Sequence, residues 1–322
     1  MSMQLTPGWL AAVQAGGYVL LAPLFTGTLT WLKSRLQGRR GPGPLQPYRD
    51  LYKLLRTRPT RPESSSVVFL LAPPTVFTCF LILGLAVPMA FPAVVGIDLV
   101  LVVGLLTLAR FATTLAAFDA GSPFGPMSAG RQWFIHVLAE PALLVAAYIF
   151  ALSAGTTSLP HIGPSAPEPT LLVSYPTLSI ALTALLFVLL AETGRLPFDR
   201  PGSHLELTLV EEGVTLDYSG RALALLWWAS SMKLTFALSL VAFLALPPSS
   251  STDQTALELG IAVLAYLGKI SMLLVLLAIW EHASAKMRLR AIPTPLALAT
   301  GVLLLVLTSL ILTFIAPIQN GG

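Results

Sequence analysis

Hydrophobic residues in this chain occur in long continuous stretches, separated by shorter segments that collect proline, glycine and charge. Eight such stretches cover residues 9–32, 67–90, 96–118, 132–153, 173–193, 220–246, 257–281 and 295–317. About 20 apolar residues in a helix span the roughly 30 Å hydrocarbon core of a bilayer. Backbone groups in lipid must find partners within the segment, so each stretch is predicted to be a helix. A barrel is excluded because the stretches do not alternate.

The pattern predicts an all-α, polytopic membrane helix bundle of about eight transmembrane helices. We treat residues 1–322 as a single integral membrane domain with long loops at 33–66, 119–131, 194–219 and 282–294. Composition agrees, since 55% of the residues are hydrophobic and only 11% are charged. A soluble domain carries about 25% charged residues. A water-soluble fold this poor in charge could not cover its own surface.

The basic residues define an orientation. Nine of the 19 lysines and arginines lie between Lys33 and Arg61, and seven more lie at the three other long loops. The remaining segments between spans, and both termini, contain none. The positive-inside rule places the basic loops in the cytoplasm. Both termini are then outside the cytoplasm, in a multi-pass protein of the inner (plasma) membrane.

Composition also excludes several classes of function. The pI near 9.4 does not indicate nucleic-acid binding, because the basic residues flank apolar stretches and form no surface with aromatic side chains. Cys79 is the only cysteine, and the four histidines have no metal-ligand spacing. No phosphate-binding loop or nucleophile elbow is present. The sequence therefore predicts no catalytic residue, no metal site and no cofactor bound by this chain.

The first basic loop contains an amphipathic segment, residues 45–56. One helical face would carry Tyr48, Leu51, Tyr52 and Leu55. The other would carry Arg49, Lys53 and Arg56. Two interpretations are open: an interfacial anchor helix, or a surface for a partner or ligand.

Ionisable residues within the apolar stretches are the main functional signal. They are Arg110, Glu140, Lys233 and Lys269, with Glu192 and Glu281 near helix ends. A charge at mid-bilayer costs about 2.5–3.5 kcal/mol on insertion scales, so such residues usually pair or serve a pathway. Static ion pairs and the movement of protons or other ions are both open for the lysines. For Glu192 and Glu281, snorkelling to the surface is a further alternative.

Four ordered motifs connect the predicted spans. They are QGRRGP at 37–42 with Gln46 and Asp50; FDAGSPFG at 118–125 with Arg131 and AEP at 139–141; AETGRLPFD at 191–199 with LEL at 205–207 and LDYSG at 216–220; and AKMRLR at 285–290. These motifs resemble the subunit 1 family of respiratory complex I. They are more similar still to the corresponding membrane subunit of group 4 [NiFe] hydrogenases, of the formate hydrogenlyase and hydrogenase-4 type. Two departures from the complex I pattern, RPGSH at 200–204 and Asp217 in place of glutamate, favour the hydrogenase branch.

The resemblance implies a subunit without a redox centre of its own. Such a subunit docks a cytoplasmic arm made of hydrogenase large and small subunits and a ferredoxin-like subunit, which carry nickel–iron and iron–sulfur centres. It also contacts antiporter-like membrane subunits. A bound quinone is implied by the complex I branch and disfavoured by the two departures.

The resemblance also assigns candidate residues by position. In complex I the acidic loop after the fifth helix borders the quinone chamber and begins a proton path. That loop corresponds to Glu192, Asp199, Glu206, either Glu211 or Glu212, and Asp217, and the family's fourth-helix glutamate corresponds to Glu140. With the residues inside spans, the proton or ion path candidates also include Arg110, Lys233, Lys269 and Glu281. Candidates for partner docking or a quinone-like cavity are Gln37, Arg39, Arg40, Gln46, Asp50, Lys53, Arg131 and Arg195.

Three functions compete on these observations. The first is an anchoring and proton- or ion-coupling subunit of a hydrogenase-type oxidoreductase, with the quinone-site subunit of a complex I-like NADH dehydrogenase as its variant. The second is an autonomous ion transporter, which the buried charges suit but the absence of paired halves does not. The third is an assembly platform in which buried charges only pair with neighbouring subunits.

Overall fold

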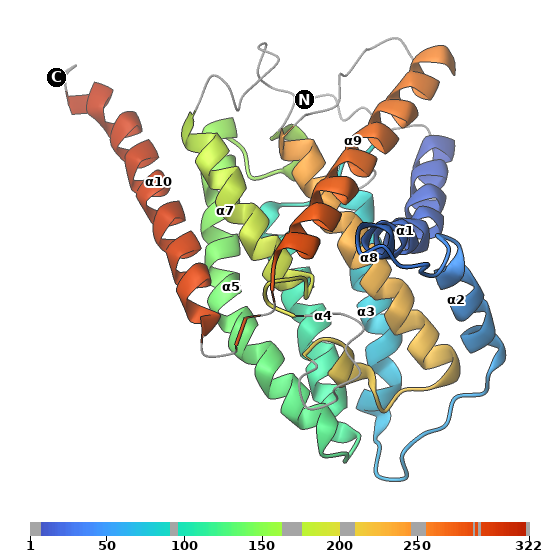
Figure 1. Cartoon of the computed structure of the whole chain (residues 1–322). Coiled ribbons are helices and arrows are strands. Elements are labelled where there is room, and N and C mark those ends of the chain that lie inside the picture. The colour runs from blue at the N-terminus through green and yellow to red at the C-terminus, as the bar shows by residue number, and fades with distance from the viewer. Residues whose placement is uncertain are drawn as a thin grey trace.

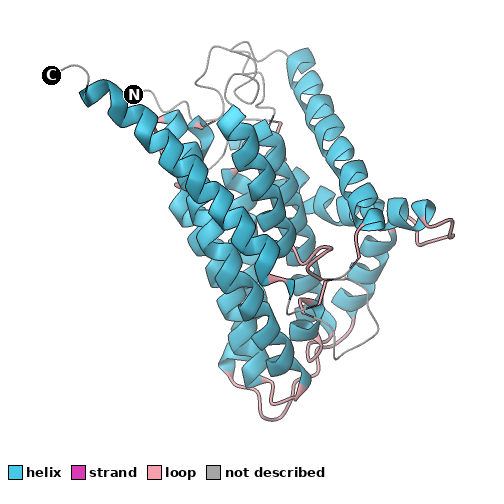
Figure 2. Cartoon of the chain, turned by 60° about the vertical axis from the view of Figure 1, so that its left-hand side comes forward, coloured by secondary structure: helices cyan, strands magenta, loops and turns pink. Residues whose placement is uncertain are grey.

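The computed structural model describes residues 8–90, 96–162, 176–199, 210–245, 256–285, 287–288 and 291–319. Its helices in these ranges are α1 (Gly8–Leu36), α2 (Gln46–Arg56), α3 (Val67–Ala86), α4 (Leu99–Asp119), α5 (Phe124–Ala154), α7 (Pro176–Glu192), α8 (Gly220–Ala245), α9 (Ala256–Ala283) and α10 (Pro293–Gln319), with short 3₁₀ turns η1 (Leu159–His161) and η3 (Glu212–Thr215). Long helices run side by side throughout this part of the chain (Figures 1 and 2). The predicted all-α architecture is confirmed.

Seven helices in the described ranges are long and apolar enough to cross a membrane. The eighth predicted span, 173–193, corresponds to the shorter apolar helix α7, whose preceding residues lie outside the described ranges. The chain is therefore a multi-pass membrane protein.

The start of α5 departs from the prediction. It begins at Phe124 rather than at residue 132, so the predicted loop 119–131 shrinks to a turn and Arg131 lies within a helix. Gly121 makes this turn with a φ of 71°, a conformation that glycine adopts without steric cost. The glycines and proline of segment 124–131 led to the prediction of a loop. The segment is helical nonetheless, because Pro126 falls in the first helical turn, where a missing N–H is tolerated.

Helix α8 is the centre of the bundle. Its residues from Ser231 to Leu244 are all buried, as expected of a helix that is apolar on every side. The hydroxyl of Tyr18 on α1 donates to the carbonyl oxygens of Phe80 on α3 (3.1 Å) and Met232 on α8 (2.8 Å). Helix α10 packs on α5 and α7 at the periphery, and α9 packs mainly on α1 (Figure 1).

Helix α2 forms where the amphipathic segment predicted it. Its Leu51 is buried, and the helix packs against α1 and α8. Tyr52, on the same predicted face, is 56% exposed, and the Arg56 guanidinium lies 4.3 Å above its ring. Only part of the apolar face is therefore buried within the chain. Both interpretations of this helix, as an interfacial anchor and as a surface for a partner or ligand, stay predictions.

The two ends of the segment after α7 lie close together. Residues 200–209, which include Glu206, lie outside the described ranges, as do Lys286 and Arg290 of the last basic loop. The Asp199 carboxylate accepts hydrogen bonds from the backbone N–H groups of Val210 (3.3 Å) and Glu211 (3.1 Å), which brings the two ends of that segment together.

Tyr218 fastens the end of the acidic loop to α3. Its ring stacks on Phe69 with centroids 4.0 Å apart, and its hydroxyl donates to the Phe69 carbonyl oxygen at 2.8 Å. Burial, and then the nearby Asp119 and Asp217 carboxylates, raise the pKa of this phenol well above its ordinary value. The hydroxyl therefore stays a hydrogen-bond donor at every physiological pH.

Candidate functional site

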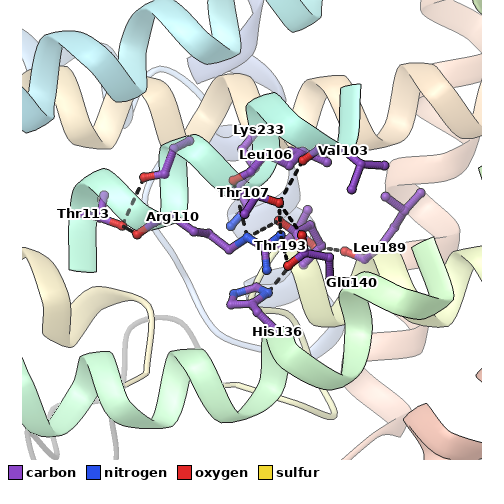
Figure 3. Close-up of polar contacts among 12 residues, drawn as sticks. Val103, Leu106, Thr107, Arg110, Thr113, His136, Glu140, Leu189, Thr193 and Lys233 are labelled. Carbon is purple, nitrogen blue, oxygen red and sulfur yellow. Dashed lines mark hydrogen bonds and ion pairs between the residues drawn. The ribbon is translucent and has the colours of Figure 1, made fainter. Parts of the chain in front are cut away.

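Four ionisable side chains meet between α4, α5 and α7 (Figure 3). The Glu192 carboxylate lies 3.5 Å from Nε of Arg110 and 3.1 Å from Nδ1 of His136. Nη2 of Arg110 lies 3.6 Å from the Glu140 carboxylate. Thr107 links them further, because its hydroxyl donates to Glu140 at 2.7 Å and accepts from Arg110 at 3.3 Å. We call Arg110, His136, Glu140 and Glu192 the inner cluster.

Helical spacing explains why these groups converge. Gln132, His136 and Glu140 follow one another at four-residue intervals on α5, so they share one face. Thr107 and Arg110, three residues apart on α4, form the facing surface. The tight turn between α4 and α5 makes the two helices antiparallel neighbours, and the two polar stripes therefore face each other in an apolar surrounding.

A cavity of about 120 Å³ lies beside the inner cluster, and both acidic-loop residues and helix residues line it. Lys233 on α8 is paired with Glu211 in its wall. Its other polar lining residues include Arg110, Gln132, Arg195, Asp199 and Glu212. Oε1 of Gln132 and Nε of Arg195 are buried without a hydrogen-bond partner among the described residues. This volume exceeds the roughly 10–15 Å³ that one water molecule requires, so the cavity has room for water beside these polar groups.

A second, smaller void of about 10 Å³ is also lined by Arg110 and Gln132. Those two residues line both spaces, and His136 and Glu140 line only the second. Its volume is close to the lower limit for a single water molecule, about 10–15 Å³. The Glu140 side chain is 29% exposed, so the series of polar groups runs from the cavity to the outer surface of the bundle.

A separate group of charges lies at the end of α9. The Glu281 carboxylate is completely buried and is paired with Lys33 on α1 and with Arg195, 3.5 Å away. We call these three residues the outer cluster. Glu281 and Glu192 are 4% and 2% exposed, so the snorkelling alternative for both glutamates is wrong: each faces cations inside the protein.

The structure brings together most, though not all, of the predicted path candidates. Arg110, Glu140 and Glu192 meet directly, while Lys233, Asp199, Glu211 and Glu212 line the adjoining cavity. Lys269 is half-buried on α9 and lines neither space, and Glu281 belongs to the outer cluster. Asp217 accepts a hydrogen bond from Ser122 at 2.6 Å, away from the cavity lining.

The docking candidates lie mostly at the surface. Gln37, Arg39, Arg40 and Lys53 are exposed, and Gln46 donates to Asp50 at 2.9 Å. Arg131 is half-buried on α5. Arg195 alone joins the interior, since it lines the cavity and pairs with Glu281.

Sequence reasoning missed His136 and Gln132. A single histidine in an apolar stretch carries no motif, and glutamine carries no charge. The available signal was their spacing, four and eight residues before Glu140, which places all three on one helical face. Among the described residues, no group of three or more His, Cys, Asp or Glu side chains is placed to hold a metal ion.

Comparison with known proteins defines the class. The family model described as NADH dehydrogenase matches residues 11–315, so the chain belongs to this family. It is 34% identical to hydrogenase-4 component C of Escherichia coli (strain K12), over 89% of this chain and 92% of that protein. It is 32% identical to formate hydrogenlyase subunit 4 of the same organism, over 87% of this chain and 91% of that protein.

More distant relatives agree with the same family. The chain is 28% identical to NADH-ubiquinone oxidoreductase chain 1 of Emballonura alecto, over 66% of this chain and 67% of that protein. The fold is shared with a chain of the membrane-bound sulfane sulfur reductase, an archaeal respiratory membrane complex. That match has a TM-score of 0.80 at 19% identity and covers 92% of this chain and 98% of the other. The family resemblance inferred from the motifs is confirmed.

Proposed function

We propose that this chain is the membrane-anchoring and proton- or ion-coupling subunit of a hydrogenase-type, formate hydrogenlyase-like oxidoreductase complex. One observation carries the proposal: Arg110 of the inner cluster lines a cavity beside the acidic loop, and the same arginine pairs with the buried Glu192 carboxylate and with the partly exposed Glu140 carboxylate. The names of its two E. coli relatives, a hydrogenase-4 component and a formate hydrogenlyase subunit, support the hydrogenase branch.

The coupling step begins in the acidic loop. Redox chemistry in a docked arm changes the charge or position of groups near Glu211 and Asp199, and a nearby charge or desolvation moves carboxylate pKa values by whole units. Protons taken up at the cavity then pass to Glu192 and on to Glu140. Lys233 holds the Glu211 side chain at the wall of this cavity.

The loops and the partly exposed Glu140 indicate where partner subunits would bind. Hydrogenase large and small subunits and a ferredoxin-like subunit, which carry the nickel–iron and iron–sulfur centres, dock at the end of the bundle that bears the basic and acidic loops. An antiporter-like membrane subunit covers Glu140, because a carboxylate left facing hydrocarbon is costly. The complex lies in the inner membrane, with both termini of this chain on the outer side.

A quinone-site subunit of a complex I-like enzyme is the second candidate. It is favoured by the family model and by the acidic wall of the cavity. The two departures from the complex I motif pattern, RPGSH at 200–204 and Asp217 in place of glutamate, weigh against it.

Purification from the native host in mild detergent tests the proposal. We expect co-purifying chains that include a nickel- and iron-containing hydrogenase arm, together with antiporter-like membrane proteins. A complex containing quinone and no nickel would support the second candidate instead. A chain that purifies alone and carries ion flux in liposomes would overturn both.

A further inference from the structure

We propose that His136 is a proton-transfer residue that links Glu192 to the small void at Glu140. The inference rests on the proposed function and deepens it, because it names the group that joins the two carboxylates. Neither the motifs nor the candidate set drawn from them includes His136.

The first argument is position. The imidazole is 5% exposed, and its Nδ1 lies 3.1 Å from the Glu192 carboxylate. The same side chain lines the void whose wall also contains Glu140. The ring therefore contacts the buried Glu192 carboxylate on α7 and also lines the void that contains the Glu140 carboxylate of α5 in its wall.

The second argument is the arrangement of the ion pairs. Arg110 faces both Glu192 and Glu140, so it holds the two carboxylates in place, but an arginine does not release its proton in proteins. Direct transfer through Arg110 is therefore excluded. Imidazole has two nitrogens that each bind or release a proton near neutral pH. Of the groups that contact Glu192, His136 is the one able to pass a proton onward.

The transfer balances without a further reactant. A protonated Glu192 gives its proton to Nδ1 of the neutral ring, which becomes an imidazolium while Glu192 becomes a carboxylate. The imidazolium then releases the Nε2 proton to a water in the void or to Glu140. One proton enters and one leaves, and the ring returns to its starting Nε2–H form by a ring flip or by proton exchange with water before the next transfer. Charged groups surround the ring from three other helices: Glu192 on α7, Arg110 on α4 and Lys233 on α8.

Gln132 lines both the cavity and the void. Its amide Oε1 is buried and has no hydrogen-bond partner among the described residues. An amide neither gains nor loses a proton at physiological pH, so Gln132 does not itself relay a proton between the two spaces. His136, four residues further along the same face of α5, carries the group that can.

The competing explanation is that His136 only positions Glu192. Two conservative substitutions separate these roles. Asparagine places an amide N–H near the position of Nδ1, and glutamine reaches the position of Nε2; both can hold a hydrogen bond, and neither can relay a proton. The matched control is His282→Asn, because His282 is an exposed histidine at the end of α9.

The experiment uses the whole complex in everted membrane vesicles. Hydrogen evolution driven by reduced methyl viologen reports the hydrogenase arm, and fluorescence quenching reports proton uptake during turnover with formate or reduced ferredoxin. We expect His136→Asn and His136→Gln to retain viologen-driven activity and to lose proton uptake at least about tenfold, as removal of an acid–base group typically costs about 10²–10⁴. His282→Asn should match the wild type.

Wild-type proton uptake in His136→Asn or His136→Gln overturns the inference, because either variant would show that hydrogen bonding alone suffices. Loss of complex assembly in both variants, with proton uptake per assembled complex unchanged, also overturns it in favour of a structural role. Wild-type vesicles that evolve hydrogen without moving protons would count against the proposed coupling function itself. The two failures are therefore distinguishable.

Discussion

The inner and outer clusters are both buried charge networks, and they differ in what surrounds them. The outer cluster joins Glu281 to two cations, so its carboxylate is compensated twice. In the inner cluster a single arginine serves two carboxylates, Glu140 and Glu192. The inner cluster also adjoins a polar cavity and a partly exposed carboxylate, whereas both carboxylate oxygens of Glu281 are fully buried.

This difference indicates a structural role for the outer cluster and a role in proton transfer for the inner cluster. The Glu281 carboxylate is held by two cations, and its effect is to join the ends of α1 and α9 to the acidic loop. In the inner cluster one arginine faces two carboxylates and an imidazole contacts one of them, and the adjoining spaces have room for water, which supplies a route for a proton. Arg195 connects the two clusters, since it pairs with Glu281 and lines the cavity.

Arg110→Met should have the largest effect. It leaves two carboxylates without their shared cation, and breaking a buried pair typically costs about 3–5 kcal/mol. We expect little assembled complex and background proton uptake, measured by immunoblotting and vesicle fluorescence. Arg58→Met, at an exposed arginine, is the control and should change stability by less than about 0.5 kcal/mol. A stable Arg110→Met complex with full proton uptake would contradict the pathway.

Glu281→Gln should reduce stability and leave coupling intact. The loss is expected near 2 kcal/mol, below the roughly 3–5 kcal/mol of a fully buried pair, because Lys33 is partly exposed and screened. Thermal unfolding of the detergent-solubilised complex measures this loss. Proton uptake per hydrogen evolved should equal the wild-type ratio in the surviving fraction, and a lowered ratio would place the outer cluster on the pathway.

Gly194→Ala probes the connection between the clusters. Gly194 has a φ of 59°, and an alanine Cβ there would collide with the Glu211 carboxylate. The left-handed conformation costs about 1–2 kcal/mol for a residue with a side chain. We expect lower stability and partial loss of proton uptake, because Glu211 is displaced from Lys233. Gly43→Ala, where a Cβ meets nothing within 4 Å, should behave as the wild type.

Tyr218→Phe should have the smallest effect. It removes one hydrogen bond to Phe69, worth about 1 kcal/mol. Because the folded-state pKa of Tyr218 lies above its ordinary value of 10.0, the unfolded state releases this proton first as pH rises past 10. The wild type therefore loses stability there that the variant keeps. Thermal unfolding at pH 8 and above pH 10 should show the difference between them shrinking; a constant difference would contradict the buried phenol.

The sequence predicted the spans well, because continuous apolar stretches leave little choice of structure. It also identified Arg110, Glu140, Glu192 and Lys233, since a charge within a span is conspicuous. It did not predict the extension of α5 to Phe124, because glycine and proline near a helix start resemble those of a loop.

The ion pairs between helices could not be predicted from the sequence, for a physical reason. Glu281 meets Lys33 across 248 positions of the chain, and no local pattern encodes a contact between the ends of α1 and α9. His136 gained its significance only from Glu192 on another helix. Charges within spans can therefore be predicted one at a time, whereas the division into an inner and an outer cluster requires the packed structure.

Glu192→Gln in the complete complex is the most direct test of the central claim, since it keeps the size of the side chain and removes its exchangeable proton. Protons taken up per hydrogen evolved should be measured in everted vesicles, beside viologen-driven hydrogen evolution. The account predicts that the ratio falls to the level of uncoupled vesicles while the viologen-driven rate is retained. A wild-type ratio in this variant would contradict it.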